Sequence, residues 1–149
     1  MQLTMFSDYA MRIALYLATN GERLVSVEEV SRAYGISRAH LVKVVQRLTE
    51  LGIVTSVRGR GGGLRLGKEP EDVDLGMLVR ATEPHLDLVE CFDEKTNTCP
   101  IDRACGLKGI LVGAQRAFLA ELDGHTLAEL VPNAPRLVPL WRAKLRRAG

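Results

Sequence analysis

The sequence has little cysteine and no long hydrophobic run. Its 149 residues include only three cysteines, and an odd number cannot be fully paired in disulfides. The first twenty residues lack the apolar core of a secretory signal, because Asp8 and Arg12 fall within them. No stretch approaches the roughly 18 apolar residues that a membrane span needs. We therefore expect a soluble, cytoplasmic protein with reduced thiols and no membrane partner, built as one domain or one domain plus an arm.

The chain also has little net charge, but the charge is unevenly distributed. The formal charge is +2 at pH 7. Residues 1–67 carry nine basic and five acidic side chains, whereas residues 68–149 carry eleven and thirteen. Between residues 37 and 65, six basic side chains are opposed by Glu50 alone. A local basic surface of this kind attracts phosphate, which favours nucleic acid as a partner.

The first fifty residues have the pattern of three helices. Ser7 is predicted to cap the first helix, and Gly21 to end it. A capping box at residues 26–29 predicts a second, short helix that stops at Gly35. Ser37 is then predicted to cap a third helix, whose apolar residues fall at helical spacing. A helix, a turn that contains glycine and a second helix form the helix-turn-helix pattern.

Two short alternating strands, residues 53–57 and 64–66, flank the sequence Arg58-Gly-Arg-Gly-Gly-Gly63. A nucleotide-binding loop is excluded, because the segment lacks the Lys-Ser/Thr of a P-loop and follows a helix instead of opening one. A β-hairpin with a glycine-rich basic tip is typical of a wing. Glycines let the backbone approach DNA closely, while Arg58 and Arg60 reach phosphates or the minor groove. The alternative is a merely flexible charged turn.

The third helix contains the predicted base-reading residues. Side chains near the start of such a helix usually meet base edges in the major groove. We therefore predict that Ser37, Arg38 and His40 read bases, and that Lys43 and Arg47 contact phosphates. Residues 1–67 are thus predicted to be a winged helix-turn-helix DNA-binding domain, mostly α with a small β-hairpin wing, whose partner is double-stranded operator DNA.

Residues 68–131 are predicted to hold the cysteine region and a dimerisation helix. Asp74 can cap a helix through Thr82. The helix expected after Cys105 has one apolar side, formed by Leu107, Ile110, Leu111, Ala114, Ala117, Phe118 and Leu122. In so small a protein this side favours a homodimer interface, with intramolecular core as the alternative. A second capping box at residues 126–129 predicts a short helix. Residues 132–149 contain three prolines and are expected to form a frayed basic tail.

The three cysteines occupy one short window with the spacing Cys91-x7-Cys99-x5-Cys105. Three soft thiolates select iron-sulfur clusters or zinc and leave a fourth position to another residue. Structural zinc usually takes four ligands in close pairs, which neither spacing matches. Burial without a ligand explains the window poorly, because the segment is polar and loop-like. The pattern therefore indicates a regulator with a metal or redox switch.

Four separated segments carry a resemblance to a known family: MQLTMFSDYAMRIALYLA, RGRGGGLRLG, ECFDEKTNTCPIDRACGL and FLAELDGHTLAELV. In this order they resemble the NsrR family of nitric-oxide-sensing repressors, related to IscR, over residues 1–131. The resemblance implies a homodimeric repressor and no enzyme, with an iron-sulfur cluster that nitric oxide nitrosylates to release DNA. It implies 4Fe-4S, with 2Fe-2S as the alternative. The implied ligands are Cys91, Cys99, Cys105 and, from the other protomer, Asp8.

Related regulators provide the alternatives. IscR has a histidine ligand shortly after its third cysteine, but here Gly106 and Leu107 stand there. The iron-responsive regulator RirA has a similar cysteine region but lacks an aspartate at the position of Asp8. His85 is a further candidate ligand. A redox carrier would leave the wing unexplained and normally uses four cysteines. A metal-free regulator that responds through cysteine oxidation also stays open.

Overall fold

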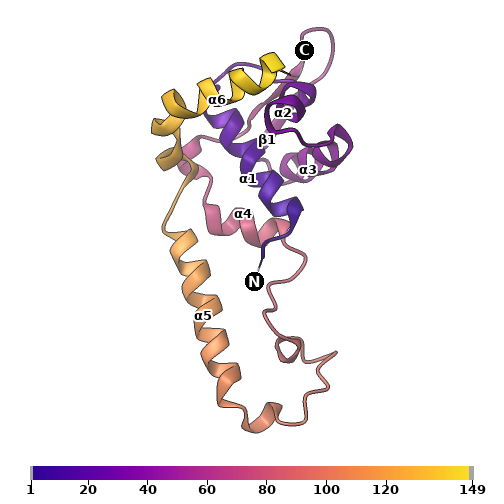
Figure 1. Ribbon diagram of the computed structural model, residues 1–149, viewed down its shortest axis with the longest axis vertical. Helices are drawn as coiled ribbons and strands as arrows, with labels where there is room; N and C mark the ends of the chain where they lie inside the picture. The colour runs from indigo at the N-terminus through magenta and orange to yellow at the C-terminus, as the bar shows by residue number, and fades with distance from the viewer. Residues whose placement is uncertain (1, 148–149) are drawn as a thin grey trace.

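The computed structural model describes residues 2–147 and places a long arm on a winged-helix body (Figure 1). The longer elements are α1 Met5–Ala18, α2 Val27–Tyr34, α3 Arg38–Glu50, β1 Val54–Val57, β2 Gly63–Leu66, α4 Leu75–Thr82, α5 Gly106–Asp123 and α6 Ala134–Arg147. Short 3-10 turns are η1 Pro70–Asp72, η2 Glu90–Phe92, η3 Asp102–Ala104 and η4 Leu127–Asn133. The prediction of a mostly helical winged fold with one hairpin is confirmed.

Helix α1 lies at the centre of the body. Its inner residues Ala10, Ile13 and Ala14 are fully buried, and α1 packs against α3, α4, β2 and η4. This apolar side of α1 is therefore the core face. Burying side chains of this size contributes roughly 1.5–3 kcal/mol for each large apolar residue. Helix α3, strand β2 and helix α4 are consequently positioned by contact with α1.

The start of α1 differs from the prediction that Ser7 caps it. Thr4 is the N-cap residue, and its side-chain oxygen accepts a hydrogen bond from the Ser7 backbone N–H at 3.3 Å. Ser7 lies in the first turn and is fully buried. The cap prediction was wrong because Thr4, three residues earlier, accepts from the Ser7 N–H and starts the helix about one turn sooner.

The helix-turn-helix is confirmed at α2 and α3. The Ser26 hydroxyl accepts from the Glu29 N–H at 3.0 Å, but the Glu29 carboxylate binds Arg23 and Tyr16, so only half of the predicted capping box forms. Gly35 ends α2 with φ of 68°, a left-handed conformation that a side chain would disfavour. The turn that this glycine permits sets the direction in which α3 begins.

Strands β1 and β2 form the predicted antiparallel wing, with Val54 opposite Leu66 and Val57 opposite Gly63. A further bridge joins Val25 to Leu64 and fixes the hairpin to the body. At the tip, a β-carbon on Gly62 would overlap the Val57 carbonyl oxygen, so only glycine closes this turn. The glycines predicted to serve close approach to DNA thus also have a role in shaping the hairpin.

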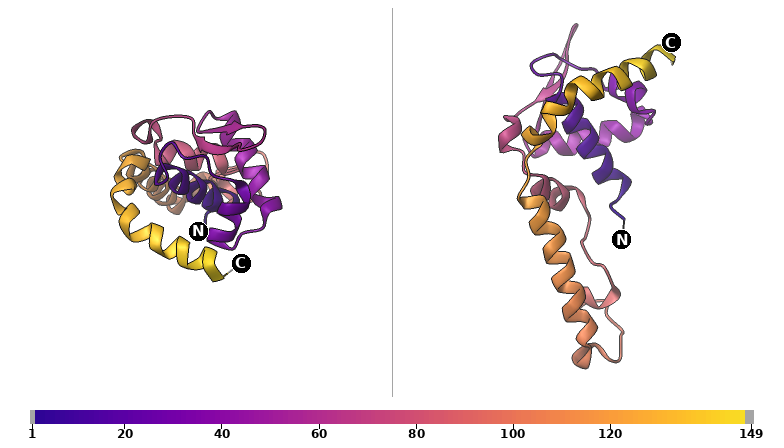
Figure 2. Two further views of the ribbon diagram at one scale, coloured as in Figure 1. Left: turned by 90° about the horizontal axis from the view of Figure 1, so that it is seen from above. Right: turned by 60° about the vertical axis from the view of Figure 1, so that its left-hand side comes forward.

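The arm consists of α5 and the cysteine segment that leads into it, and it extends away from the body (Figures 1 and 2). No residue between 83 and 126 is buried. The predicted apolar side of α5 is divided between two environments. Leu111, Phe118 and Leu122 are half-buried, whereas Leu107, Ile110, Ala114 and Ala117 are exposed. No helix among residues 2–147 combines the length and apolar character that spanning a membrane requires.

The C-terminal segment is a helix where a frayed, proline-broken tail was expected. Pro135 lies in the first turn of α6, where its missing N–H costs nothing, and Pro139 lies inside the helix. Trp141 is 8% exposed. Its ring centroid lies 4.7 Å from that of Tyr16 and 5.7 Å from that of Tyr34. This packing on α1 and α2 offsets the cost of the interior proline. Residues 132–147 therefore belong to the body.

Candidate functional site

The start of α3 presents the three predicted base-reading residues to solvent. Ser37, Arg38 and His40 are exposed, while Leu41, Val44 and Leu48 on the opposite side are buried at 0–1% exposure. Ser37 occupies the N-cap position, but its hydroxyl makes no capping hydrogen bond. The helix is therefore held by its apolar face and leaves its first turn open for contact with DNA.

His40 is the one predicted base-reading residue that contacts an aromatic ring. The ring centroid of Tyr9 in α1 lies 6.5 Å from that of the imidazole, with 27° between the ring planes. A shallow apolar groove between the two helices is lined by Met5, Phe6, Tyr9, His40, Lys43 and Val44. The spacing of residues in the sequence did not indicate this contact, because the angle at which two helices pack is not encoded by the spacing of either.

The two residues predicted to contact phosphates differ in their surroundings. Lys43 is exposed and lies beside the groove. The Arg47 guanidinium donates to the Ala81 carbonyl at 3.1 Å and lies 3.3 Å from the Glu50 carboxylate. Arg47 thus joins α3 to the end of α4 within the chain. Its contact with phosphate stays a prediction.

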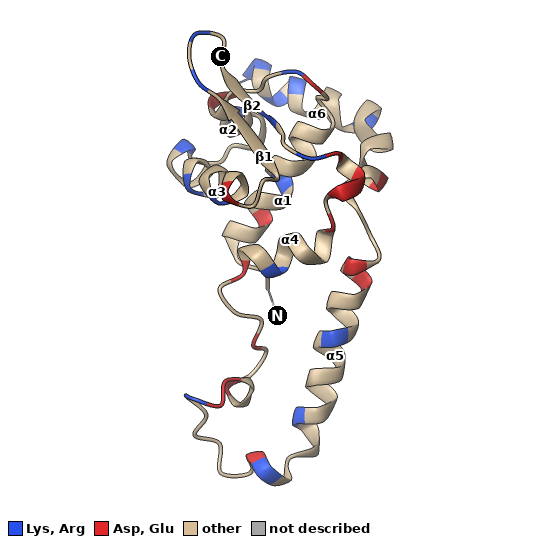
Figure 3. Cartoon of the chain, turned by 180° about the vertical axis from the view of Figure 1, so that it is seen from behind, with Lys and Arg blue, Asp and Glu red and all other residues tan. Residues whose placement is uncertain are grey.

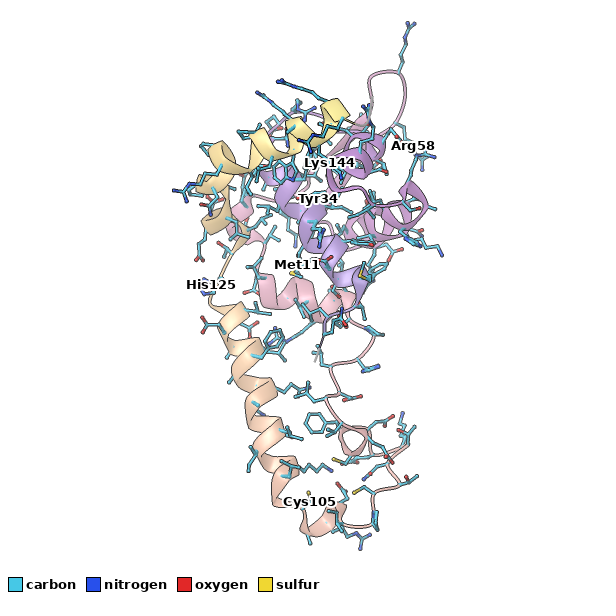
Figure 4. The ribbon with its side chains drawn as sticks, in the orientation of Figure 1. Met11, Tyr34, Arg58, Cys105, His125 and Lys144 are labelled. Carbon is cyan, nitrogen blue, oxygen red and sulfur yellow. The ribbon has the colours of Figure 1, made fainter. Side chains whose placement is uncertain are left out.

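The wing carries Arg58 and Arg60 on its exposed tip. Arg58 points outward on the side of the body that carries α3 (Figure 4). Basic residues follow α3, the wing tip and α6, whereas acidic residues gather near the end of α5 and in the cysteine segment (Figure 3). Arg65 of the same hairpin is paired with Glu22 at 2.8 Å. The wing arginines and the start of α3 form one candidate DNA-binding surface.

The cysteine loop, residues 84–105, brings together the neighbours of Cys91 and Cys99. The Glu90 carboxylate accepts from the Thr98 N–H at 2.6 Å and from its hydroxyl at 2.7 Å. These hydrogen bonds, with the hydroxyl contributing most, lower the pKa of Glu90. Because each partner is adjacent to a cysteine, the two thiols are held in one part of the loop. No motif or spacing in the sequence indicates this pair.

Cys105 lies at the far end of the arm, where α5 begins (Figure 4). The Asp102 carboxylate in the preceding turn accepts a hydrogen bond from Lys108 Nζ at 2.8 Å, which raises the pKa of Lys108. All three cysteines are free and half-buried. Within residues 2–147, no three His, Cys, Asp or Glu side chains are arranged as a ready-made metal site. The donor chemistry nevertheless suits a cluster, since three unpaired thiols share one loop that little packing restrains.

Asp8 is not grouped with the cysteines of the same chain in the described residues 2–147. It is in the first turn of α1, inside the body, and its carboxylate is paired with Arg12 at 2.8 Å (Figure 1). His85, the other candidate ligand, has a 68% exposed side chain whose Nδ1 lies 4.0 Å from Asp87. One chain therefore does not bring Asp8 to the cysteines, and a ligand role for it requires a second copy.

Comparisons with known proteins agree with this geometry. The Rrf2 family model, described as an iron-dependent transcriptional regulator, matches residues 3–133. The NsrR regulator of Bacillus subtilis strain 168 is 45% identical over 146 residues, covering 97% of this chain and 99% of that protein. The NsrR regulator of Shouchella clausii is 46% identical over 145 residues, covering 97% of each. The resemblance seen in four sequence segments is thereby confirmed over nearly the whole chain.

Solved structures support the same assignment. CymR, the global cysteine regulator of Bacillus subtilis, is similar with a TM-score of 0.70 and 26% identity over 89% of this chain and 97% of its own. The IscR of T. potens has a TM-score of 0.72 and 25% identity over 90% of this chain and 88% of its own. The chain therefore belongs to the Rrf2 family of winged-helix transcriptional regulators.

Proposed function

We propose that this chain is a nitric-oxide-responsive repressor that binds operator DNA as a homodimer. It releases the DNA when nitric oxide nitrosylates an iron-sulfur cluster. The observation that carries the proposal is the position of three free thiols in one unburied loop, on an arm attached to a winged-helix body. Regulators of this design couple the chemistry of one site to the DNA affinity of another. The NsrR names of its relatives support nitric oxide as the signal.

The DNA-binding part of the proposal rests on the exposed residues of α3 and the wing. Arg38 and His40 are placed to enter the major groove, and Ser37 lies beside them. Arg58 and Arg60 reach phosphates or the minor groove from a hairpin fixed to the body by the Val25–Leu64 bridge. Lys43 and Arg47 add positive charge along the same helix, so binding should weaken steeply with salt.

The dimer part rests on the exposed apolar side of α5. Leu107 and Ile110 are 59% and 70% exposed, and the neighbouring Ala114 and Ala117 are exposed as well. Large apolar side chains flanked by small ones allow two helices to approach closely. A second copy seated on this side would bury them and give a two-fold assembly that matches two operator half-sites.

The cluster part assigns Cys91, Cys99 and Cys105 as thiolate ligands and Asp8 of the partner subunit as the fourth. When bound, the cluster, most simply 4Fe-4S, supplies iron that nitric oxide attacks. The carboxylate of Asp8 is a harder and weaker ligand for iron than a thiolate, which leaves one iron approachable. Arg12 pairs with this carboxylate at 2.8 Å on the surface of α1. A ligand from the other subunit would tie the position of α1 to the state of the cysteine loop.

The testing experiment compares two signals on protein purified without oxygen. Visible absorption with iron and sulfide analysis first establishes whether a cluster is present. Nitric oxide should then bleach the absorption and abolish operator binding in parallel, while brief iron chelation should do little. Chelation that releases DNA while nitric oxide leaves it bound would instead identify an iron sensor of the RirA kind. Protein that carries no iron and releases DNA only on thiol oxidation would overturn the cluster itself.

A further inference from the structure

Tyr9 is the aromatic residue through which α1 contacts the base-reading end of α3. Its ring stacks on His40 at 6.5 Å with 27° between the planes. Tyr9 is half-buried, whereas His40 and its sequence neighbours Arg38 and Ala39 are exposed. The imidazole is therefore paired with an aromatic ring of α1 while the residue stays exposed, so it remains available to a base.

The position of Tyr9 is fixed by the rest of α1. The next residue, Ala10, is fully buried, and Ile13 and Ala14 are fully buried one turn further on. Interiors of this kind are close-packed, so the backbone at Tyr9 cannot shift without moving the core. Met5 and Phe6 extend the same contact surface along the groove toward Lys43. Tyr9 is thus a rigid support for a side chain that otherwise has little holding it.

An exposed histidine at the start of a helix samples several rotamers, and base readout depends on where its ring nitrogens lie. A flat ring packed against one face removes those rotamers in which the imidazole turns away. Ordering the side chain before DNA arrives reduces the entropy lost on binding. The contact with Tyr9 therefore acts on recognition without any contact between Tyr9 and a base.

We infer that Tyr9 is a positioning residue for base readout, which orients His40 and makes operator discrimination depend on the placement of the first turns of α1. The inference rests on the proposed function, because it takes His40 to read a base. It goes further by adding a residue that does not contact DNA to the specificity determinants. Asp8 adjoins Tyr9 in the same helix, so a displacement of one displaces the other.

The test uses the full chain with Tyr9→Leu and Tyr9→Phe. Leu keeps an apolar side chain in the groove but removes the flat ring, whereas Phe keeps the ring. Affinity is measured for an operator selected by the unaltered protein and for operators changed at single base pairs. Tyr9→Leu should reduce discrimination at the base pair that is sensitive to His40→Ala by about 3- to 10-fold, and Tyr9→Phe should preserve it. In a His40→Ala background, Tyr9→Leu should cause no further loss.

A second measurement needs no DNA. Proton NMR of the unaltered protein should show ring-current shifts of the His40 imidazole protons that Tyr9→Phe retains and Tyr9→Leu removes. If Tyr9→Leu fails to fold, contacts between the two rings in the unaltered protein decide the matter by nuclear Overhauser effects. Unchanged discrimination in folded Tyr9→Leu, or the absence of any ring contact, overturns the inference. A lack of sequence preference in the unaltered protein would overturn the proposed function instead.

Discussion

The Glu83 carboxylate accepts two hydrogen bonds from Thr4, one from its backbone N–H at 2.8 Å and one from its hydroxyl at 3.0 Å. Glu83 is the residue that ends α4 and leads into the cysteine loop, while Thr4 caps α1. The start of the cysteine loop is thereby joined to the helix that carries Asp8 and Tyr9. The pair links the base of the arm directly to α1.

Removal of either partner should lower stability. Thr4→Ala and Glu83→Gln should each reduce the free energy of unfolding by about 1 kcal/mol, because a helix cap and a charge-assisted hydrogen bond are lost. The double variant should cost little more than the larger single effect. Urea unfolding at fixed protein concentration measures these values. Glu71→Gln, an exposed control on η1, should change stability by less than about 0.5 kcal/mol. Fully additive losses would mean that the two residues act separately.

The wing arginines should contribute to the salt dependence of DNA binding. Arg58→Ala and Arg60→Ala should each reduce the slope of log affinity against log salt by about 0.9, because each loses one phosphate contact. Titrations of labelled operator at several salt concentrations measure the slope. Arg65→Ala is the matched control, since Arg65 is in the same hairpin but paired with Glu22. An unchanged slope in the Arg58 and Arg60 variants would remove the wing from the phosphate contacts.

The exposed side of α5 should control dimerisation. Ile110→Glu places a charge in the proposed interface and should shift the protein toward monomer, with a loss of at least about 2 kcal/mol of association free energy. Sedimentation equilibrium measures the shift. Arg116→Glu, also exposed but about 120° around the helix, serves as the control.

Insertion of about five base pairs between operator half-sites should abolish cooperative binding. Equally tight binding to the altered site would argue against a two-fold dimer.

Asp8 and the cysteines should differ in their effects on the cluster. Any of Cys91→Ala, Cys99→Ala or Cys105→Ala should prevent stable assembly, because two thiolates and a carboxylate hold a cluster poorly. Asp8→Ala should still permit assembly but weaken the link between cluster loss and DNA release. Iron content, visible absorption and operator affinity measure the two effects. Arg12→Ala, which removes the ion pair and keeps the carboxylate, should retain the response. Identical behaviour of Asp8→Ala and unaltered protein would restrict Asp8 to a helix-dipole role.

Alkaline pH should destabilise the fold through Tyr16. Burial, together with its hydrogen bond to Glu29, raises the pKa of Tyr16 from 10.0 to about 12. Between these values the unfolded chain binds fewer protons than the folded one, so stability is present below pH 10 and is lost as pH rises toward 12. The loss should reach about 2 kcal/mol. Urea unfolding across this range should show a shallower decline in Tyr16→Phe, with the remainder due to Tyr34, whose pKa burial also raises. An identical decline in both proteins would contradict the assignment.

Local patterns in the sequence were sufficient to predict the elements that begin or end at a residue with a specific backbone role. Gly35 at the end of α2, the glycines of the wing tip and Asp74 at the start of α4 each act within a few residues of their own position. The position at which α3 begins follows from the same local rules. The number and spacing of the three cysteines likewise indicate a site for an iron-sulfur cluster or zinc without knowledge of the surrounding fold.

Contacts between distant segments were decided only by the tertiary structure. The prolines of α6 predict a broken tail when read locally, but packing of Trp141 against Tyr16 and Tyr34 stabilises a helix there. The Thr4–Glu83 and Tyr9–His40 contacts join residues whose meeting depends on helix packing. Helix packing also decides that Asp8 lies in the body, on α1, whereas the cysteines lie on the arm. Short-range backbone preferences are encoded in neighbouring residues, whereas side-chain contacts across the molecule depend on how the buried faces fit together.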